Sequence, residues 1–243
     1  MTKILSISAD NVINEFNVNN SAAVKVFNCD NRDNYSKMSV NKAVGVNSIL
    51  YFVNSMRMIS SHWDKVIRKW DLNTCRMEVE YIGHSDWVYS CVLTKDEKTL
   101  YSSSKDGTIR EWNVDTGKCT YEFKTRFNSI YTLKFNGNFS RLLFATSDAN
   151  VYEWDIKTKK IIREYKGHFG RVFSAAYNSD FTKIVTFSED QTIRIWEVES
   201  GQCIKVIYNI MGLLIQGCTF KNLKDQNNSQ DIKELIQTYG GQM

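Results

Sequence analysis

The sequence lacks the residues on which several kinds of functional site depend. It contains no proline, to which we attach no functional weight, and it has three histidines, His62, His84 and His168. Its six cysteines include no Cys-x-x-Cys pair, which argues against the common zinc sites. The phosphate-binding glycine motifs of P-loop and dinucleotide-binding proteins are missing as well. We therefore expect no metal and no cofactor.

Long hydrophobic runs and blocks of one charge are also missing. No stretch approaches the roughly 18 apolar residues of a membrane span, and the first residues lack the apolar run of a signal peptide. The 31 basic and 27 acidic residues are interspersed, which argues against direct binding of nucleic acid. Widely spaced cysteines are typical of buried reduced thiols, so we expect no membrane association and a cytoplasmic or nuclear location.

A repeat of 42 residues runs through most of the chain. Four tryptophans stand at this spacing: Trp70, Trp112, Trp154 and Trp196. An aspartate lies six positions before each of them: Asp64, Asp106, Asp148 and Asp190. An earlier, degenerate copy places Phe16 in the tryptophan position and Asp10 in the aspartate position. Self-similarity at this period is typical of a propeller or solenoid.

Each unit reads as four short strands. In the unit of Trp112, the segments DWVYSCVLT, TLYSSS, TIREWNV and CTYEF are separated by the short polar turns KDEK, KDG and DTGK. Four strands joined by tight turns in about 42 residues predict one blade of a β-propeller.

The sequence resembles the WD-repeat β-propellers over residues 4 to about 220. The Gly-His pairs of that family are matched by Gly83-His84 and Gly167-His168. The Trp-Asp pairs are matched by Trp70-Asp71 and Trp154-Asp155. We expect an all-β propeller domain of four-stranded antiparallel blades over residues 1–222, followed over 223–243 by a loop and a short helix. For residues 231–239, an extra strand is the alternative.

Five first strands and five third strands are expected. The first strands begin near Val46, Val88, Ile130, Val172 and Leu214, and the third strands centre on the five repeat aromatics from Phe16 to Trp196. The chain begins at a second strand, so the resemblance implies that residues 213–220 complete the first blade. A five-bladed ring and a partial arc of a larger propeller are both compatible with this count.

Two sets of His, Ser or Thr, Asp and Trp recur 84 residues apart, and a hydrolase triad is one interpretation of them. The sets are His84, Ser102, Asp106 and Trp112, and His168, Thr186, Asp190 and Trp196. The family resemblance implies that each set is a structural hydrogen-bonded tetrad. Buried indole, imidazole and carboxylate groups need partners in any case, and catalytic sites are rarely duplicated at a repeat period. We therefore predict no catalytic residue.

Two copies of the tetrad are degenerate. The unit of Trp70 keeps Ser60 and Asp64 but has Lys42 in the histidine position. The unit of Trp154 has Arg126 in the histidine position and Phe144 in the serine position. We expect His62 to be a surface or turn residue.

The resemblance also implies a partner-binding face. In the family, the side chains of this face stand one and three residues after the Gly-His pair and just before the turn aspartate. The corresponding residues are Trp63, Ser85, Trp87, Lys105, Phe127, Ser129, Ser147, Phe169, Arg171, Glu189, Met211 and Leu213. Aromatic residues, Met and Arg are enriched at protein interfaces, although packing against neighbours is the alternative role for the aromatics.

These observations favour a noncatalytic scaffold that binds protein or peptide partners and helps assemble a complex. The alternatives are a substrate-recruiting adaptor of a ubiquitin ligase, a subunit of a ribonucleoprotein complex, and a hydrolase built on a propeller. The partner and the pathway are not encoded in the repeat pattern, because one fold serves many functions.

Overall fold

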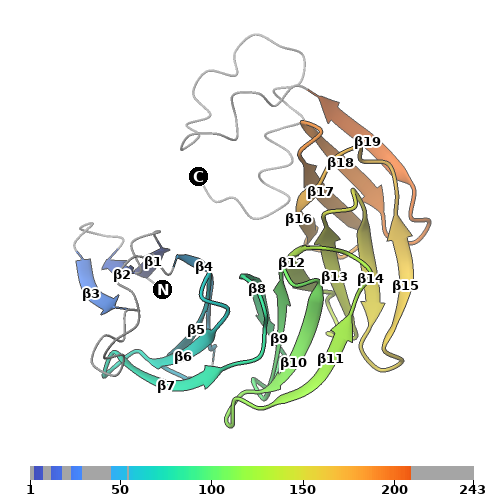
Figure 1. The fold of residues 1–243 in the computed structure, drawn as a ribbon. Helices are drawn as coiled ribbons and strands as arrows, with labels where there is room; N and C mark the ends of the chain where they lie inside the picture. The colour runs from blue at the N-terminus through green and yellow to red at the C-terminus, as the bar shows by residue number, and fades with distance from the viewer. Residues whose placement is uncertain (1–2, 8–11, 18–22, 29–44, 54, 209–243) are drawn as a thin grey trace. The chain divides into compact units, whose positions relative to one another are not determined.

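A computed structural model of the protein describes residues 3–7, 12–17, 23–28, 45–53 and 55–208. The regular structure in these residues consists entirely of β-strands, as the repeat pattern predicts (Figure 1). The chain divides into two compact units, residues 1–130 and 131–243.

The first unit contains three antiparallel sheets. The first sheet has three strands: β1 (Lys3–Ile7), β2 (Val12–Asn17) and β3 (Ala23–Asn28). The second sheet has four: β4 (Val46–Tyr51), β5 (Arg57–His62), β6 (Ile67–Asp71) and β7 (Arg76–Tyr81). The third sheet also has four: β8 (Val88–Leu93), β9 (Thr99–Ser104), β10 (Thr108–Asn113) and β11 (Cys119–Lys124).

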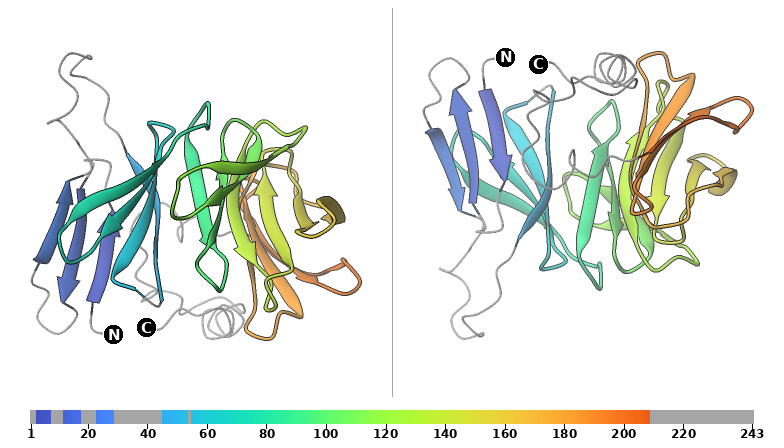
Figure 2. Two further views of the ribbon diagram at one scale, coloured as in Figure 1. Left: turned by 90° about the horizontal axis from the view of Figure 1, so that it is seen from below. Right: turned by 90° about the horizontal axis from the view of Figure 1, so that it is seen from above.

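The second unit contains two antiparallel sheets of four strands. The first of them has β12 (Ile130–Phe135), β13 (Arg141–Thr146), β14 (Val151–Asp155) and β15 (Lys160–Tyr165). The other has β16 (Val172–Tyr177), β17 (Lys183–Ser188), β18 (Thr192–Glu197) and β19 (Cys203–Tyr208). The strands of each sheet are hydrogen-bonded in sequence order and are twisted (Figure 2).

The strand register repeats as closely as the sequence does. In all five sheets the strand of the repeat aromatic has a β-bulge just before that residue, in its pairing with the strand that follows it. The bulge lies between Glu15 and Phe16 in the degenerate copy and between Glu111 and Trp112 in the third sheet. A bulge bends a strand and increases its twist, and bulges at one repeated place indicate a common architecture. The prediction of four-stranded blades is therefore confirmed, and β2 belongs to the same repeat as the four tryptophan strands.

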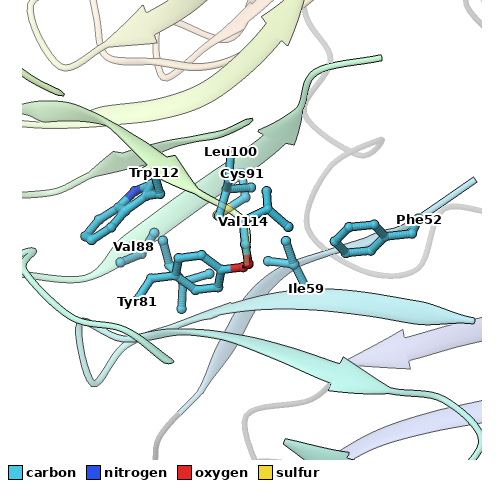
Figure 3. Close-up of a cluster of buried hydrophobic side chains, with 9 residues drawn as sticks. Phe52, Ile59, Tyr81, Val88, Cys91, Leu100, Trp112 and Val114 are labelled. Carbon is cyan, nitrogen blue, oxygen red and sulfur yellow. The ribbon is translucent and has the colours of Figure 1, made fainter. Parts of the chain in front are cut away.

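Adjacent sheets pack face to face within each unit. Between the second and third sheets, Trp112 lies edge-on to Tyr81, with ring centroids 6.0 Å apart, and both side chains are buried (Figure 3). The hydroxyl of Tyr81 donates a hydrogen bond to the carbonyl of Val114 at 2.8 Å, so its polar end is satisfied inside the core. Tyr165 and Trp196 repeat this contact in the second unit, at 5.8 Å.

Several predictions of the sequence lie outside the described residues. They are the helix or strand at 231–239, the loop and helix of 223–243, the first-type strand at 213–220, and Lys42. The choice between a five-bladed ring and an arc therefore stays a prediction. Cys75, Cys91, Cys119 and Cys203 are free thiols, but only Cys91 is buried and Cys119 is exposed, so the expectation of buried thiols is wrong for Cys119.

Candidate functional site

Four side chains of the third sheet form a continuous hydrogen-bonded chain. The indole N–H of Trp112 donates to Ser102 Oγ at 2.8 Å, and Ser102 Oγ lies 2.7 Å from His84 Nε2. His84 Nδ1 lies 2.8 Å from Asp106 Oδ2. Because an ionised carboxylate can only accept, the histidine donates to it from Nδ1. Nε2 of a neutral imidazole then accepts from the Ser102 hydroxyl, which itself accepts from the indole.

The last sheet repeats this chain with a threonine. Trp196 donates to Thr186 Oγ1 at 2.8 Å, and Thr186 Oγ1 lies 2.7 Å from His168 Nε2. His168 Nδ1 lies 2.8 Å from Asp190 Oδ2. Both sets are thus built from the residues that the repeat spacing singles out, and one contact geometry occurs in each unit of the molecule.

The electrostatics of the two tetrads favour a neutral histidine beside an ionised aspartate. Burial of the imidazoles lowers the pKa of His84 and of His168, and this effect outweighs the adjacent carboxylates. Burial alone would raise the pKa of Asp190. Hydrogen bonds from the Phe169 amide, the Thr192 hydroxyl and His168 instead lower it to about 2. The pKa of Asp106 is likewise held well below its usual range, against the effect of burial.

The tetrad geometry leaves no room for nucleophilic catalysis at the serine position. Ser102 and Thr186 are fully buried, and each hydroxyl is already bonded to an indole and an imidazole. A nucleophile has to reach a carbonyl carbon or a phosphorus atom of the substrate. A hydroxyl held inside a packed sheet cannot do so. The contacts of these residues are those of a structural brace.

His62 corrects one expectation drawn from the sequence. It is fully buried, not a surface or turn residue, and its Nε2 lies 2.7 Å from Ser60 Oγ. Trp70 donates to the same hydroxyl at 2.7 Å, so His62 takes the role that His84 has in the third sheet. Residues two apart on a strand point to the same face, and the pattern Ser60-x-His62 carries that signal. Asp64 instead binds Arg68, with oxygen and nitrogen 2.6 Å apart.

The unit of Trp154 replaces the polar tetrad with an aromatic pair. Phe144 occupies the serine position, is fully buried, and stacks on Tyr152 with ring centroids 5.3 Å apart. The Tyr152 hydroxyl donates to Asp148 at 2.7 Å, so the turn aspartate keeps a buried partner. The same place in the repeat is thus filled by apolar packing where the histidine and serine are missing.

The first unit gathers three of the expected binding residues at one end of its second and third sheets. Trp63, which follows β5, stacks on Trp87, which precedes β8, with ring centroids 5.1 Å apart and planes 16° from parallel. The ammonium of Lys105 lies 4.6 Å from the centre of the Trp87 ring, within cation–π range. We call Trp63, Trp87 and Lys105 the indole cluster. Ser85, another of the expected residues, is also exposed.

The indole cluster is held by the backbone and by a glycine. Trp63 and Lys105 occupy equivalent repeat positions, and their amides donate to the carbonyls of Gly45 and Trp87 at 2.9 and 2.8 Å. A Cβ at Gly45 would lie 2.6 Å from the Trp63 ring, so the missing side chain makes room for the indole. The indole N–H of Trp63 donates to the side-chain oxygen of Asn47 at 2.6 Å, which fixes the orientation of the ring. Trp87 keeps 37% of its surface exposed and is accessible to a partner.

The second unit presents another part of the expected face. Phe169 is 90% exposed, and the guanidinium of Arg194 lies 5.8 Å from its ring centre. Arg171 and Glu189 are exposed and form an ion pair at 3.7 Å, and the Glu189 amide donates to the Arg171 carbonyl as Lys105 does to Trp87. The same backbone frame thus carries an indole and a lysine in one unit and an ion pair in the other.

The remaining expected face residues are placed differently. Phe127 and Ser129 are buried, and Ser147 is half-buried. The guanidinium of Arg126 lies 5.4 Å from the Phe127 ring centre. Met211 and Leu213 lie outside the described residues.

Among the described residues, no group of three or more His, Cys, Asp or Glu side chains is arranged to hold a metal ion. Within that part of the chain, no helix has the length and apolarity needed to cross a membrane.

Comparison with known proteins agrees with the repeat. A family model described as "WD domain, G-beta repeat" matches residues 74–113 and 159–197. Over 39 residues the chain is 31% identical to "MST50-interacting protein 11" of Pyricularia oryzae and to "Small ribosomal subunit protein RACK1" of Neurospora crassa. It is 36% identical to "Small ribosomal subunit protein RACK1" of Caenorhabditis elegans over the same length. These matches cover 16% of this chain and 12% of each relative.

Proposed function

Because this chain is a WD-repeat protein, we propose that it is a noncatalytic scaffold that binds a protein or peptide partner and helps assemble a complex. The observation that carries the proposal is the indole cluster at the exposed end of the second and third sheets. Trp63 and Trp87 come from different sheets, are stacked at 5.1 Å, and support the ammonium of Lys105.

The chemistry of the indole cluster suits a protein partner. Tryptophan supplies a large apolar contact at low entropic cost, and it is prominent among the residues that contribute most to binding energy. The orientation of Trp63 is already fixed by the Asn47 hydrogen bond and by the close approach of Gly45, and Trp87 stacks on it, so binding would not have to order the Trp63 ring. Lys105 adds a charge at the rim, where it would steer a partner more than hold it.

The tetrads support the noncatalytic part of the proposal. Their hydroxyls are the best candidate nucleophiles in the sequence, and both are consumed by hydrogen bonds inside buried sheets. WD-repeat proteins in general are noncatalytic.

The experiment is affinity purification of the intact chain, followed by identification of the copurifying proteins and measurement of their affinity. Trp87→Ala is expected to weaken binding of the main partner by about 2 kcal/mol, the size of an interface hot spot, while the Tm of the chain is kept. Lys105→Ala is expected to have a smaller effect. Lys118→Ala is the matched control, because Lys118 is an exposed lysine in the turn between β10 and β11, at the opposite end of the same sheet.

The outcome against this proposal is unchanged partner binding by Trp87→Ala together with a lowered Tm. That pair of results would assign the indole cluster to packing. Turnover that is lost in Ser102→Ala without unfolding would contradict the noncatalytic part.

A second candidate function is a subunit of a ribonucleoprotein complex. It is favoured by two of the similar proteins, which carry the name of a small ribosomal subunit protein, although the match spans 12% of their length. Cosedimentation of the chain with ribosomal subunits, retained at physiological salt and lost in Trp87→Ala, is the expected result for this role. A chain that stays at the top of the gradient would rule it out.

Two further expectations remain proposals. The role of a ubiquitin-ligase adaptor is a common one for this family, and copurification of ligase subunits would support it. We also propose a cytoplasmic or nuclear location, which is supported by the free thiols of Cys75, Cys91, Cys119 and Cys203. Imaging of the tagged chain tests this location.

A further inference from the structure

The residue two positions before each repeat tryptophan faces the fourth strand of its sheet. In three sheets a glutamate of that strand lies directly opposite it, in the pairs Arg68–Glu80, Arg110–Glu122 and Tyr152–Glu164. Glu80 and Glu122 form ion pairs with their arginines, and Glu164 accepts a hydrogen bond from the Tyr152 hydroxyl at 2.9 Å. A carboxylate therefore fills this place in the repeat wherever the sheet supplies one.

The last sheet keeps the arginine and lacks the glutamate. Arg194 of β18 lies opposite Val206 of β19. Its guanidinium contacts the Cys203 sulfur at 4.0 Å and the Phe169 ring, whose centre is 5.8 Å away. Within the described ranges no carboxylate forms an ion pair with Arg194, which is half-buried. The last sheet thus has the cation of the pair without its anion.

The guanidinium of Arg194 is held where its counterpart in the third sheet is held. A Cβ at Gly167 would lie 3.0 Å from Arg194 Nη1, and a Cβ at Gly83 would lie 2.7 Å from Arg110 Nη1. In both sheets the missing side chain of the Gly-His glycine makes room for the arginine. Arg194 therefore stands in the position in which Arg110 pairs with a carboxylate.

The other carboxylates of the last sheet are engaged elsewhere or point elsewhere. Asp190 belongs to the tetrad, where it accepts from the imidazole at 2.8 Å. Glu189 forms its ion pair with Arg171 at 3.7 Å. Glu197 directly follows the repeat tryptophan, which shares a face of the sheet with Arg194, so Glu197 points to the opposite face. None of the three replaces the missing glutamate.

The charges at the end of β15 also point away from Arg194. Tyr165 packs on Trp196 across the two sheets, and adjacent residues of a strand point to opposite faces. Glu164 therefore faces the other side of its own sheet, where the Lys166 ammonium lies 3.0 Å from its carboxylate. Arg194 is left as the uncompensated charge at this place.

We propose that Arg194 and Phe169 form a subsite that binds an acidic side chain of a protein partner, whose carboxylate takes the place that Glu122 has in the third sheet. The inference rests on the proposed function of a partner-binding scaffold and adds the chemistry that one part of the expected face selects. A guanidinium matches a carboxylate as a planar fork of donors. The exposed Phe169 ring supplies apolar contact beside it.

A carboxylate suits this subsite better than a phosphate group. Arg194 contributes one uncompensated positive charge, because the neighbouring Arg171 and Lys166 are each paired with a glutamate. One carboxylate balances that charge, whereas a phosphorylated side chain carries about −1.5 to −2. The pair of Arg110 and Glu122 shows that the geometry of the repeat accommodates a carboxylate. A phosphorylated peptide is kept as an outcome of the test.

The first test asks whether the place opposite Arg194 accepts a carboxylate. Val206→Glu restores the arrangement of the third sheet, and Val206→Gln has nearly the same shape without the charge. The Tm of Val206→Glu is expected to exceed that of Val206→Gln by about 1–3 °C, the effect of a partly exposed ion pair. The difference is expected to vanish when Arg194→Gln is added to both variants.

The second test measures binding to the full chain by fluorescence anisotropy. Three labelled peptides carry four repeats of Glu-Leu-Ser, of Gln-Leu-Ser, or of phosphoserine-Leu-Ser. The Glu peptide is expected to bind about tenfold more tightly than the Gln peptide, and Arg194→Gln and Val206→Glu are each expected to abolish this preference. Lys183→Gln is the control, because it removes an exposed positive charge at the other end of the same sheet and should keep the preference.

Three results would overturn the proposal. One is equal affinity for the Glu and Gln peptides, or no binding of the Glu peptide up to about 1 mM. Another is a preference that persists in both Arg194→Gln and Val206→Glu, which would assign it to another cation. The third is tighter binding of the phosphoserine peptide that depends on Arg194, which would assign the subsite to phosphate.

Failure of the proposed function has a different signature. It would appear as the absence of copurifying partners, or as unchanged partner binding by Trp87→Ala, and neither result involves Arg194 or Val206. A main partner that still requires Trp87, together with equal affinity for the Glu and Gln peptides, would remove only the acidic subsite.

Discussion

The repeat tryptophans bury an indole N–H that has to find a partner, and at the scale of single residues the chain solves this in more than one way. Trp112 and Trp196 each donate to a hydroxyl that is also hydrogen-bonded to a histidine from the loop before the first strand of the sheet. Trp70 donates to Ser60, which is braced by His62 from the same strand. An unpaired buried donor costs about 1–3 kcal/mol, so each solution is a measurable part of stability.

His62→Ala is expected to lower the free energy of unfolding by about 1–3 kcal/mol, because it leaves the buried Ser60 hydroxyl without its imidazole partner. Urea denaturation followed by tryptophan fluorescence measures the change. Arg76→Ala is the matched control, since Arg76 is exposed on the same sheet and its loss is expected to have little effect. Equal stability of the two variants would show that His62 does not brace the sheet.

The tetrads also predict how stability depends on pH. Burial lowers the pKa of His84 and of His168 below their ordinary value of 6.5. The unfolded chain therefore binds more protons than the folded chain below about pH 6.5. The free energy of unfolding is expected to be highest above that pH and to fall as the pH falls toward the folded values. Denaturant titrations at about pH 7.5, 6.5 and 5.5 measure this slope.

A further loss is expected in more acidic solution, because the folded pKa of Asp190 is about 2 against an ordinary value of 3.8. The folded carboxylate resists protonation that the unfolded chain accepts, so stability declines as the pH falls from about 4 toward 2. The variant His84→Gln/His168→Gln should flatten the slope between pH 6.5 and 5.5. It should keep part of the acid loss, because the Phe169 amide and the Thr192 hydroxyl still hydrogen-bond the Asp190 carboxylate. An unchanged slope in that variant would locate the pH dependence elsewhere.

At the scale of the strand and the turn, the same backbone conformation recurs with different residues. In the four sheets that contain the repeat tryptophans, the turn between the second and third strands has a residue with positive φ at equivalent places: Lys65, Gly107, Ala149 and Gln191. Three of these are not glycine, so the conformation alone does not select glycine. The surroundings of Gly107 do, since a Cβ there would lie 2.2 Å from the Phe127 carbonyl oxygen.

Gly107→Ala is accordingly expected to destabilise the chain by about 1–3 kcal/mol, because the turn or the Phe127 backbone has to move. Thermal unfolding measures the change in Tm. Gln191→Ala, at the equivalent turn of the last sheet, keeps a residue with a Cβ and is expected to stay within about 0.5 kcal/mol. A Gly107→Ala variant as stable as Gln191→Ala would show that the close approach is not a constraint.

The elements themselves were predictable from the sequence, and some contacts between them were not. Strands β4, β8, β12 and β16 begin at Val46, Val88, Ile130 and Val172, where alternating apolar residues follow a polar turn. His62 was missed because the repeat pattern assigns the histidine position of this unit to Lys42. The contact of His62 with Ser60, the hydroxyl to which Trp70 donates, comes from a different place in the repeat. The position of Arg194 beside Gly167 was missed because it joins a strand to the loop that leads in from the preceding sheet.

At the scale of the whole molecule, the charge balance decides how the chain meets other molecules. The net charge of +4 comes from 31 basic and 27 acidic residues spread over the repeats. Nucleic-acid affinity depends on clustered cations that release counterions from phosphates. The sequence offers short basic patches in place of a long basic stripe, so partners are expected to be engaged through local surfaces such as the indole cluster.

Direct RNA binding is therefore expected to be weak at about 150 mM salt, even if the chain belongs to a ribonucleoprotein. Filter binding of a labelled single-stranded RNA at about 50 and 150 mM salt measures this. A high affinity at low salt that falls steeply with salt would contradict the expectation and would point to an electrostatic RNA surface.

The sequence by itself determined the blade, the strand order within each blade, and the members of the two tetrads. These follow from a period of 42 residues and from alternation along strands, which are properties of local neighbours on one chain. Only the tertiary structure decided which side chains meet across strands and across sheets. The stacking of Trp63 on Trp87, the bracing of Trp70 by His62 and the placement of Arg194 beside Gly167 depend on how twisted sheets bring residues together, and periodicity carries no such information.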